Sequence, residues 1–95
     1  MKNCRFSVEA RQDLQGIHDY IAAEDPAAAL RLVERIEQSC QLLAENPLMG
    51  EACDFLTERL RMTAFGNYIL FHRPDDDGAK IVRVIHGACD WRRLF

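Results

Sequence analysis

Residues 81–95, IVRVIHGACDWRRLF, hold most of the side chains that could do chemistry. His86 and Cys89 offer a base and a thiol nucleophile, a pairing that works only when the thiol is ionised. An unperturbed thiol, with a pKa of about 8.5, is mostly protonated at neutral pH. The pattern also predicts a strand that ends at Gly87, which puts Cys89 beyond a bend. We therefore expect His86 to end a strand, Cys89 to pack as a small apolar side chain, and neither to be catalytic.

Ribonuclease chemistry is a second possibility for the same segment. Cleavage of RNA through its 2′-hydroxyl needs a general base, a general acid and cations that face the phosphate. Arg83, Arg92 and Arg93 supply cations, and His72 or His86 could move a proton. The terminal Phe95 has no hydroxyl to give or take one. An endonuclease therefore stays as the alternative to a protein that acts by binding.

Metal binding and cofactor chemistry are not indicated. The histidines and cysteines are dispersed, with no spacing typical of a metal site and no C-x-x-C pair, so we expect free thiols in a reducing compartment. No apolar run approaches the roughly 20 residues that span a bilayer, and the first residues lack the apolar stretch of a signal peptide. We expect a cytoplasmic protein without cofactor, metal or membrane contact. The side chains concerned are His18, His72, His86, Cys4, Cys40, Cys53 and Cys89.

The charges divide unevenly along the chain. The net charge is −3, but residues 58–95 have seven basic against five acidic side chains. Three of those five form the run 75–77, which we interpret as a solubilising hairpin tip. An acidic whole argues against sequence-independent adhesion to nucleic acid, and nothing indicates direct sequence-specific binding. A local basic surface is instead suited to an acidic partner.

Four arginines are the main candidates for that surface. Arg59 and Arg61 alternate with apolar residues and point to one side of a predicted strand, and Arg73 and Arg83 can join them across the sheet. They form either a solvated polar face or a platform that anchors an acidic segment through bidentate hydrogen bonds, and we favour the platform. The tail adds four further binding candidates, Trp91, Arg92, Arg93 and Phe95, of which Trp91 and Phe95 could equally be core.

The periodicity of apolar residues predicts the helices and strands that hold these side chains in place. Ninety-five residues, 48% apolar and 28% charged, predict one globular domain spanning residues 1–95. A short strand precedes Ser7, which suits the N-cap of a first helix. Asp25 and Pro26 suit the cap and first turn of a second helix, which Asn46 and the following proline end. Two long helices joined by so few residues must pack as an antiparallel hairpin.

The second half of the chain changes to a period of two. After a predicted loop at 48–57, alternating residues indicate three strands, separated by a turn at 66–67 and a polar hairpin at 74–78. The predicted fold class is therefore α+β: an N-terminal strand, an antiparallel helical hairpin, a three-stranded antiparallel meander and a short C-terminal tail. The hairpin covers one face of the sheet, and we expect the other face to be open and to carry the arginines.

The ordered set of motifs resembles the ParE branch of the RelE/ParE toxin superfamily. It consists of DLQGIHDYI at 13–21, DPAAALRL at 25–32, LAENPLMG at 43–50, LR at 60–61, GNYILFHR at 66–73 and RVIHGA at 83–88. The resemblance implies the same fold and the toxin half of a type II toxin–antitoxin module. Two positions depart from the family pattern, because Cys89 and Glu51 stand where an arginine is common. Both remove positive charge from the expected contacts.

The resemblance also implies partners. ParE-like members are associated with inhibition of DNA gyrase, whereas RelE-like members cut mRNA on the ribosome. Each is neutralised by an antitoxin with a disordered segment that folds across the toxin. We therefore expect a non-enzymatic toxin that binds DNA gyrase and is held by a cognate ParD-like antitoxin. The alternatives are a ribosome-dependent mRNA endonuclease and an inactive relative that only binds the antitoxin.

Overall fold

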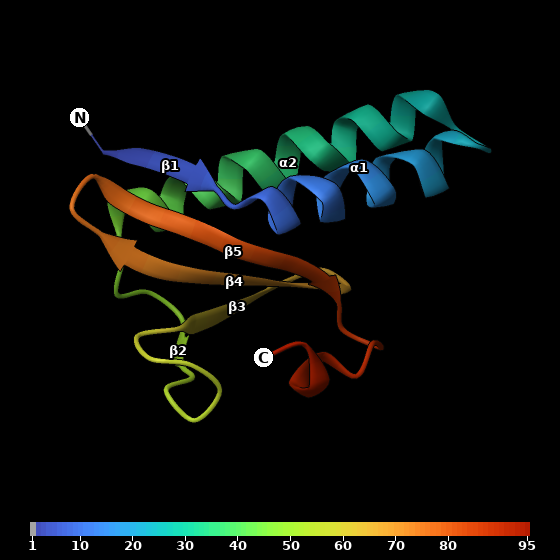
Figure 1. Cartoon of the computed structure of the whole chain (residues 1–95). Coiled ribbons are helices and arrows are strands. Elements are labelled where there is room, and N and C mark those ends of the chain that lie inside the picture. Colours follow the sequence, from blue (N-terminus) through green and yellow to red (C-terminus); the bar gives the residue numbers. More distant parts are fainter. Residues whose placement is uncertain (1) are drawn as a thin grey trace.

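Two helices pack against one face of a five-stranded sheet in the computed structural model, which describes residues 2–95 (Figure 1). α1 spans Val8–Ala22, and the Ser7 hydroxyl caps it by accepting a first-turn N–H. α2 spans Pro26–Glu45, and the Asp25 carboxylate caps it in the same way. Both predicted helix starts are confirmed, because a short side-chain oxygen can pair an N–H that has no partner within the helix.

The sheet has the order β1-β5-β4-β3-β2, in which β1 runs parallel to β5 and the other neighbours are antiparallel. The predicted α+β architecture and helical hairpin are confirmed. The predicted loop at 48–57 contains one extra strand, β2, which has only two residues and hence no periodic signal. The elements are β1 (Asn3–Phe6), β2 (Glu51–Ala52), β3 (Arg61–Phe65), β4 (Tyr68–Asp75), β5 (Gly78–His86) and a final 3-10 turn η1 (Trp91–Leu94).

The main core lies between the helices and the sheet. Ile36, Cys40 and Leu43 project from α2 at helical spacing and are fully buried. They meet Leu70 of β4 and Ile81 of β5, which are also fully buried. Large apolar side chains that lose their whole exposed surface stabilise a fold by about 1.5–3 kcal/mol each relative to solvent exposure. This core fixes the helical hairpin on the sheet.

The opposite face of the sheet, called the reverse face below, is not open as the sequence predicted. A second core covers part of it, built on Cys53, Leu60, Phe71 and Ile85. In Figure 1 the helices lie above the sheet, while the β2 region and the C-terminal turn lie below it. The expectation failed because the apolar residues of the loop before β3 and of the tail follow no regular period, yet both segments fold back over the sheet.

A β-bulge changes the side-chain pattern of β5. Phe71 is the register partner of Arg83, but the next residue, His72, pairs with Ile81, so Val82 is an extra residue. Strict alternation predicted that Ile81 and Arg83 share a face with Ile85. Ile81 instead joins the main core and Ile85 joins the core on the reverse face. The strand is confirmed, but the assignment of its side chains to faces is wrong beyond residue 81.

Candidate functional site

Arg83 is held by α1. Its guanidinium donates two hydrogen bonds to the Asp13 carboxylate, from Nε at 2.8 Å and Nη2 at 2.9 Å. The same carboxylate accepts the Val84 N–H at 2.9 Å. Hydrogen bonding to Asp13 raises the pKa of Arg83 above its ordinary value, although partial burial opposes this. Arg83 therefore has an intramolecular counterion, and its assignment to a shared arginine platform is wrong.

The reason lies in how the edge of β5 is covered. β1 ends at Phe6, so it pairs with β5 only as far as Ile81. Beyond that point α1 borders the strand: the Ser7 hydroxyl donates to the Val82 carbonyl at 2.7 Å, and Asp13 accepts from β5. The long Arg83 side chain at this edge therefore reaches the Asp13 carboxylate of α1. The sequence pattern contained no sign of where β1 would stop pairing.

Arg61 and Arg59 support the loop before β3. Arg61 donates to the carbonyls of Met49 at 3.1 Å and Gly50 at 2.8 Å, which fixes the segment that leads into β2. Arg59 lies outside the strand, with φ of +62°, and its N–H donates to the Asp54 carboxylate at 2.9 Å. The predicted pair of neighbouring strand arginines is therefore wrong, since only Arg61 belongs to β3.

The tail packs against its own domain. The Phe71 ring lies 5.6 Å from the Trp91 ring and 4.8 Å from the Phe95 ring, centroid to centroid. Arg92 stacks over the Trp91 ring at 4.5 Å. Trp91 and Phe95 are thus part of the core on the reverse face, as one of the two interpretations had it. The guanidinium of Arg93 forms an exposed ion pair with Asp90 at 3.2 Å.

A basic hollow remains on the reverse face, at the end of the sheet away from the tail. Lys80 of β5 is the register partner of Arg5 on β1 and of Arg73 on β4. Registered partners share a face, so the three exposed cations lie side by side across the strands. Arg59 reaches the same hollow, which has a volume of about 370 Å³. Its lining is completed by Pro74 and two carboxylates, Glu58 and Asp75.

Asp75 neutralises one of these cations. Its carboxylate accepts the Arg5 guanidinium at 2.9 Å and the Asp77 N–H at 3.0 Å. Burial pushes the pKa of Asp75 upward, but these hydrogen bonds outweigh it and leave the pKa below its ordinary value. Of the ion pairs formed between residues 2–95, none involves Arg59, Arg73 or Lys80. The hollow thus keeps an excess of positive charge.

A second recess lies between α1 and the end of β5. It has a volume of about 580 Å³ and is mainly apolar. Tyr20 stands at its side with 83% of its surface exposed, and Leu94 is partly exposed. Cys89 and His86 line the recess too, but the His86 Nδ1 accepts the Ala88 N–H at 3.1 Å. The imidazole is therefore oriented by the backbone of the bend.

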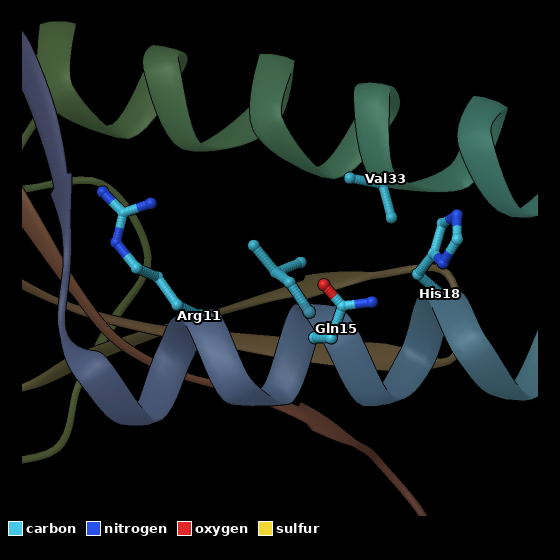
Figure 2. A pocket seen from close by; sticks show the side chains of 5 residues that line it. Arg11, Gln15, His18 and Val33 are labelled. Atoms are coloured by element: carbon cyan, nitrogen blue, oxygen red, sulfur yellow. The ribbon is translucent and has the colours of Figure 1, made fainter.

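The other histidines lie in unrelated surroundings. His18 lies on α1 beside a shallow hollow of about 300 Å³, where Figure 2 shows Arg11, Gln15 and His18 on the side of α1 that faces α2, which contributes Val33. His72 is fully buried, and its Nε2 lies 2.9 Å from the Pro47 carbonyl. Burial lowers the pKa of His72, and the bond to Pro47 only partly offsets this. A neutral imidazole that donates to the carbonyl is a structural group.

The cysteines are free thiols, as expected from the sequence. Burial raises the pKa of Cys53, so this thiol is less readily ionised than an exposed one. Cys40 is fully buried in the main core, while Cys89 is exposed in the bend after β5, so the expectation that Cys89 packs as a small apolar side chain is wrong. In residues 2–95 no three metal-ligating side chains come together. Over the same range, no helix is both long and apolar enough to cross a bilayer.

Comparison with known proteins decides the family. A sequence model described as "ParE toxin of type II toxin-antitoxin system, parDE" matches residues 4–91. The chain belongs to the ParE toxin family. The resemblance seen in the sequence motifs is thereby confirmed, and this chain is a ParE-type toxin of a type II toxin–antitoxin system.

This ParE-family chain is similar to a known protein in sequence and to a solved structure in fold. The protein named "Putative toxin Y4kP" from Sinorhizobium fredii (strain NBRC 101917 / NGR234) is 33% identical over 94 residues, which is 99% of this chain and 97% of the relative. A solved structure, "Chromosomal ParDE TA system from P. aeruginosa", is similar with a TM-score of 0.74. It covers 90% of this chain and 96% of its own, at 21% identity, and so supports the fold alone.

Two of the four cations of the basic hollow were not among the sequence candidates. Arg5 and Lys80 each alternate with apolar neighbours, a pattern that places them on the face away from the helices. That signal was present in the sequence. Nothing in the sequence indicated that β1 pairs in parallel with β5, and this pairing is what puts Arg5 directly beside Lys80. Of the predicted arginines, Arg59 and Arg73 belong to this hollow, whereas Arg61 and Arg83 do not.

Proposed function

We propose that this ParE-family toxin acts by binding DNA gyrase, in the cytoplasm, and that a cognate ParD-like antitoxin neutralises it. The observation that supports this most directly is the match of the ParE family model to residues 4–91, nearly the whole chain. The toxin works by occupying a surface of its target and not by breaking a bond. Its antitoxin works by covering toxin surface that the target needs.

The contacts that Arg83, Arg92 and Arg93 make within the toxin favour binding over catalysis. A ribonuclease needs cations that are available to a phosphate in the transition state. Arg83 already pairs with Asp13, and Arg93 pairs with Asp90. Arg92 lies over the Trp91 ring. Of these pairs, only Arg83–Asp13 is largely removed from solvent, and an arginine held in this way suits a structural role better than it suits a phosphate-cleaving site.

The proposal is tested with purified toxin in two parallel assays. Supercoiling of relaxed plasmid by DNA gyrase should fall as toxin is added, and an equimolar amount of the antitoxin should restore it. In a translating extract the same toxin should leave mRNA intact. Transcripts cut at codon boundaries, with supercoiling unaffected, would instead identify a ribosome-dependent nuclease.

Expression in cells gives an independent measurement. Toxin produced without antitoxin should stop growth, and coexpression of the antitoxin should restore it. Normal growth with folded wild-type toxin would show an inactive relative and refute the proposed inhibition.

A further inference from the structure

The basic hollow contains an unfavourable electrostatic arrangement. Lys80 stands directly opposite a like charge on both neighbouring strands, Arg5 on β1 and Arg73 on β4. Like charges at opposed positions destabilise a sheet. Of these three cations, only Arg5 has a carboxylate partner within residues 2–95. A bound anion at Lys80 would relieve the repulsion that remains.

We propose that the basic hollow binds a carboxylate-bearing segment of the antitoxin. This inference rests on the proposed function, because it takes the antitoxin as the partner, and it adds the site and the chemistry of recognition. The hollow is formed by Arg5, Arg59, Arg73 and Lys80, at the end of the reverse face away from the C-terminal tail.

The charges at the rim favour a protein segment over nucleic acid. Glu58 and Asp75 line the same hollow as the four cations. A continuous phosphate backbone, with one charge at every nucleotide, would meet these carboxylates and a chain with a net charge of −3. A peptide can place its carboxylates at Lys80 and Arg73 and a neutral side chain beside Glu58.

The spacing of the cations indicates the form of the segment. Neighbouring strands lie about 4.8 Å apart, so Arg5 and Arg73, on either side of Lys80, are separated by about 10 Å at the backbone. Alternate residues of an extended peptide are about 7 Å apart, which long arginine side chains can bridge. Two acidic residues that alternate along an extended segment would fit, with Arg73 making a bidentate contact and Lys80 a point contact.

Lys80→Glu gives a test in which affinity and stability should move in opposite directions. In the free toxin the new carboxylate faces two arginines, so the melting temperature should rise by about 2–5 °C. Affinity for the purified antitoxin should fall about tenfold at low salt, and its salt dependence should become weaker. Lys2→Glu is the matched control, because Lys2 and Lys80 are the only lysines in the chain. It should change the affinity less than twofold.

Carbodiimide cross-linking locates the contact directly. The reagent joins an amine to a carboxylate in contact, so the wild-type complex should give a Lys80–antitoxin adduct that mass spectrometry can assign to an acidic antitoxin residue. Lys80→Arg should remove this adduct and keep wild-type affinity, since it keeps the charge. An adduct at Lys2 alone would overturn the proposal.

The outcomes separate this inference from the proposed function. If wild-type toxin does not bind the antitoxin, both are overturned. If it binds, but Lys80→Glu binds as tightly, only the proposed site is overturned. Two further results for Lys80→Glu would also overturn the proposed site, if its affinity for the antitoxin is unchanged. Loss of gyrase inhibition would assign the hollow to the target, and loss of duplex DNA binding would assign it to phosphates.

Discussion

Removal of the Asp13 carboxylate should destabilise the toxin more than most substitutions on the surface of a helix do. The carboxylate accepts three hydrogen bonds, two from Arg83 and one from the Val84 N–H. The Arg83 and Asp13 side chains are only 24% and 15% exposed, so water replaces these bonds poorly. Asp13→Ala therefore leaves a partly buried charge and an unpaired N–H on β5.

The magnitude follows from these two losses. Breaking a fully buried pair costs about 3–5 kcal/mol and an exposed one about 0–1 kcal/mol, so this intermediate pair should account for about 1–2 kcal/mol. An unpaired buried N–H at Val84 adds about 1–2 kcal/mol. Asp13→Ala should thus lower the free energy of unfolding by about 3 kcal/mol. Asp13→Asn keeps an oxygen that can accept from Val84 and should cost about half as much.

Urea unfolding, followed by the fluorescence of Trp91, the only tryptophan, measures this change. Arg83→Ala and the double variant complete a mutant cycle, in which the coupling energy should be about 1–2 kcal/mol. The control is Asp90→Ala, because the Asp90–Arg93 pair is 65% and 85% exposed and should contribute less than about 0.5 kcal/mol. If Asp13→Ala costs no more than this control, the edge of β5 does not depend on α1 as we argue.

Three further predictions concern His72, the tail and two glycines. Because burial lowers the pKa of His72, the unfolded state binds the proton more readily, so stability should fall as the pH drops below about 6.5. Urea midpoints between pH 7.5 and 5 should show this slope, and His72→Gln, although less stable, should not. Phe95→Ala should cost about 1–2 kcal/mol and red-shift Trp91 emission through the loss of packing on Phe71; an unshifted spectrum would mean that the tail does not pack as described. Gly16→Ala in α1 should raise stability by about 0.5–1 kcal/mol, since a Cβ at this position meets nothing within 4 Å. Gly50→Ala should lower stability, because Gly50 has a φ of +88° and a Cβ there would lie 2.5 Å from a carbonyl oxygen. Thermal unfolding compares the two variants, and the same sign for both would contradict the backbone argument.

The features that could be predicted from sequence depend on neighbours in the chain. Ser7 and Asp25 cap their helices because an N-cap oxygen reaches an N–H only three residues away. Asn46 ends α2 because the following proline disfavours a helical residue before it. The turn at 66–67 and the hairpin predicted at 74–78 were found for similar local reasons, although the strands extend into that loop and leave only residues 76–77 as the turn. Contacts between residues only a few positions apart can be predicted from the order of the residues.

The features that were missed depend on contacts between distant segments. The position of Arg83 follows from the extra residue Val82 and from the point where β1 stops pairing. The cover on the reverse face brings Phe95 onto Phe71 across an entire strand and bend. A strictly alternating pattern cannot contain either fact, because one inserted residue inverts the faces that follow it. Of the four predicted arginines, Arg59 and Arg73 line one hollow together with Arg5 and Lys80, whereas Arg61 and Arg83 lie elsewhere.

One feature of the fold explains why the cations divide in this way. A strand edge with unpaired N–H and carbonyl groups invites another strand, and β1 is too short to cover all of β5. α1 completes the cover with Ser7 and Asp13, which pair with the β5 backbone in place of a strand. A carboxylate in that position needs a cation, and Arg83 provides it. The ladder of Arg5, Lys80 and Arg73 lies on the reverse face, where no helix carboxylate reaches it, and within residues 2–95 only Arg5 of the three has a carboxylate partner, Asp75.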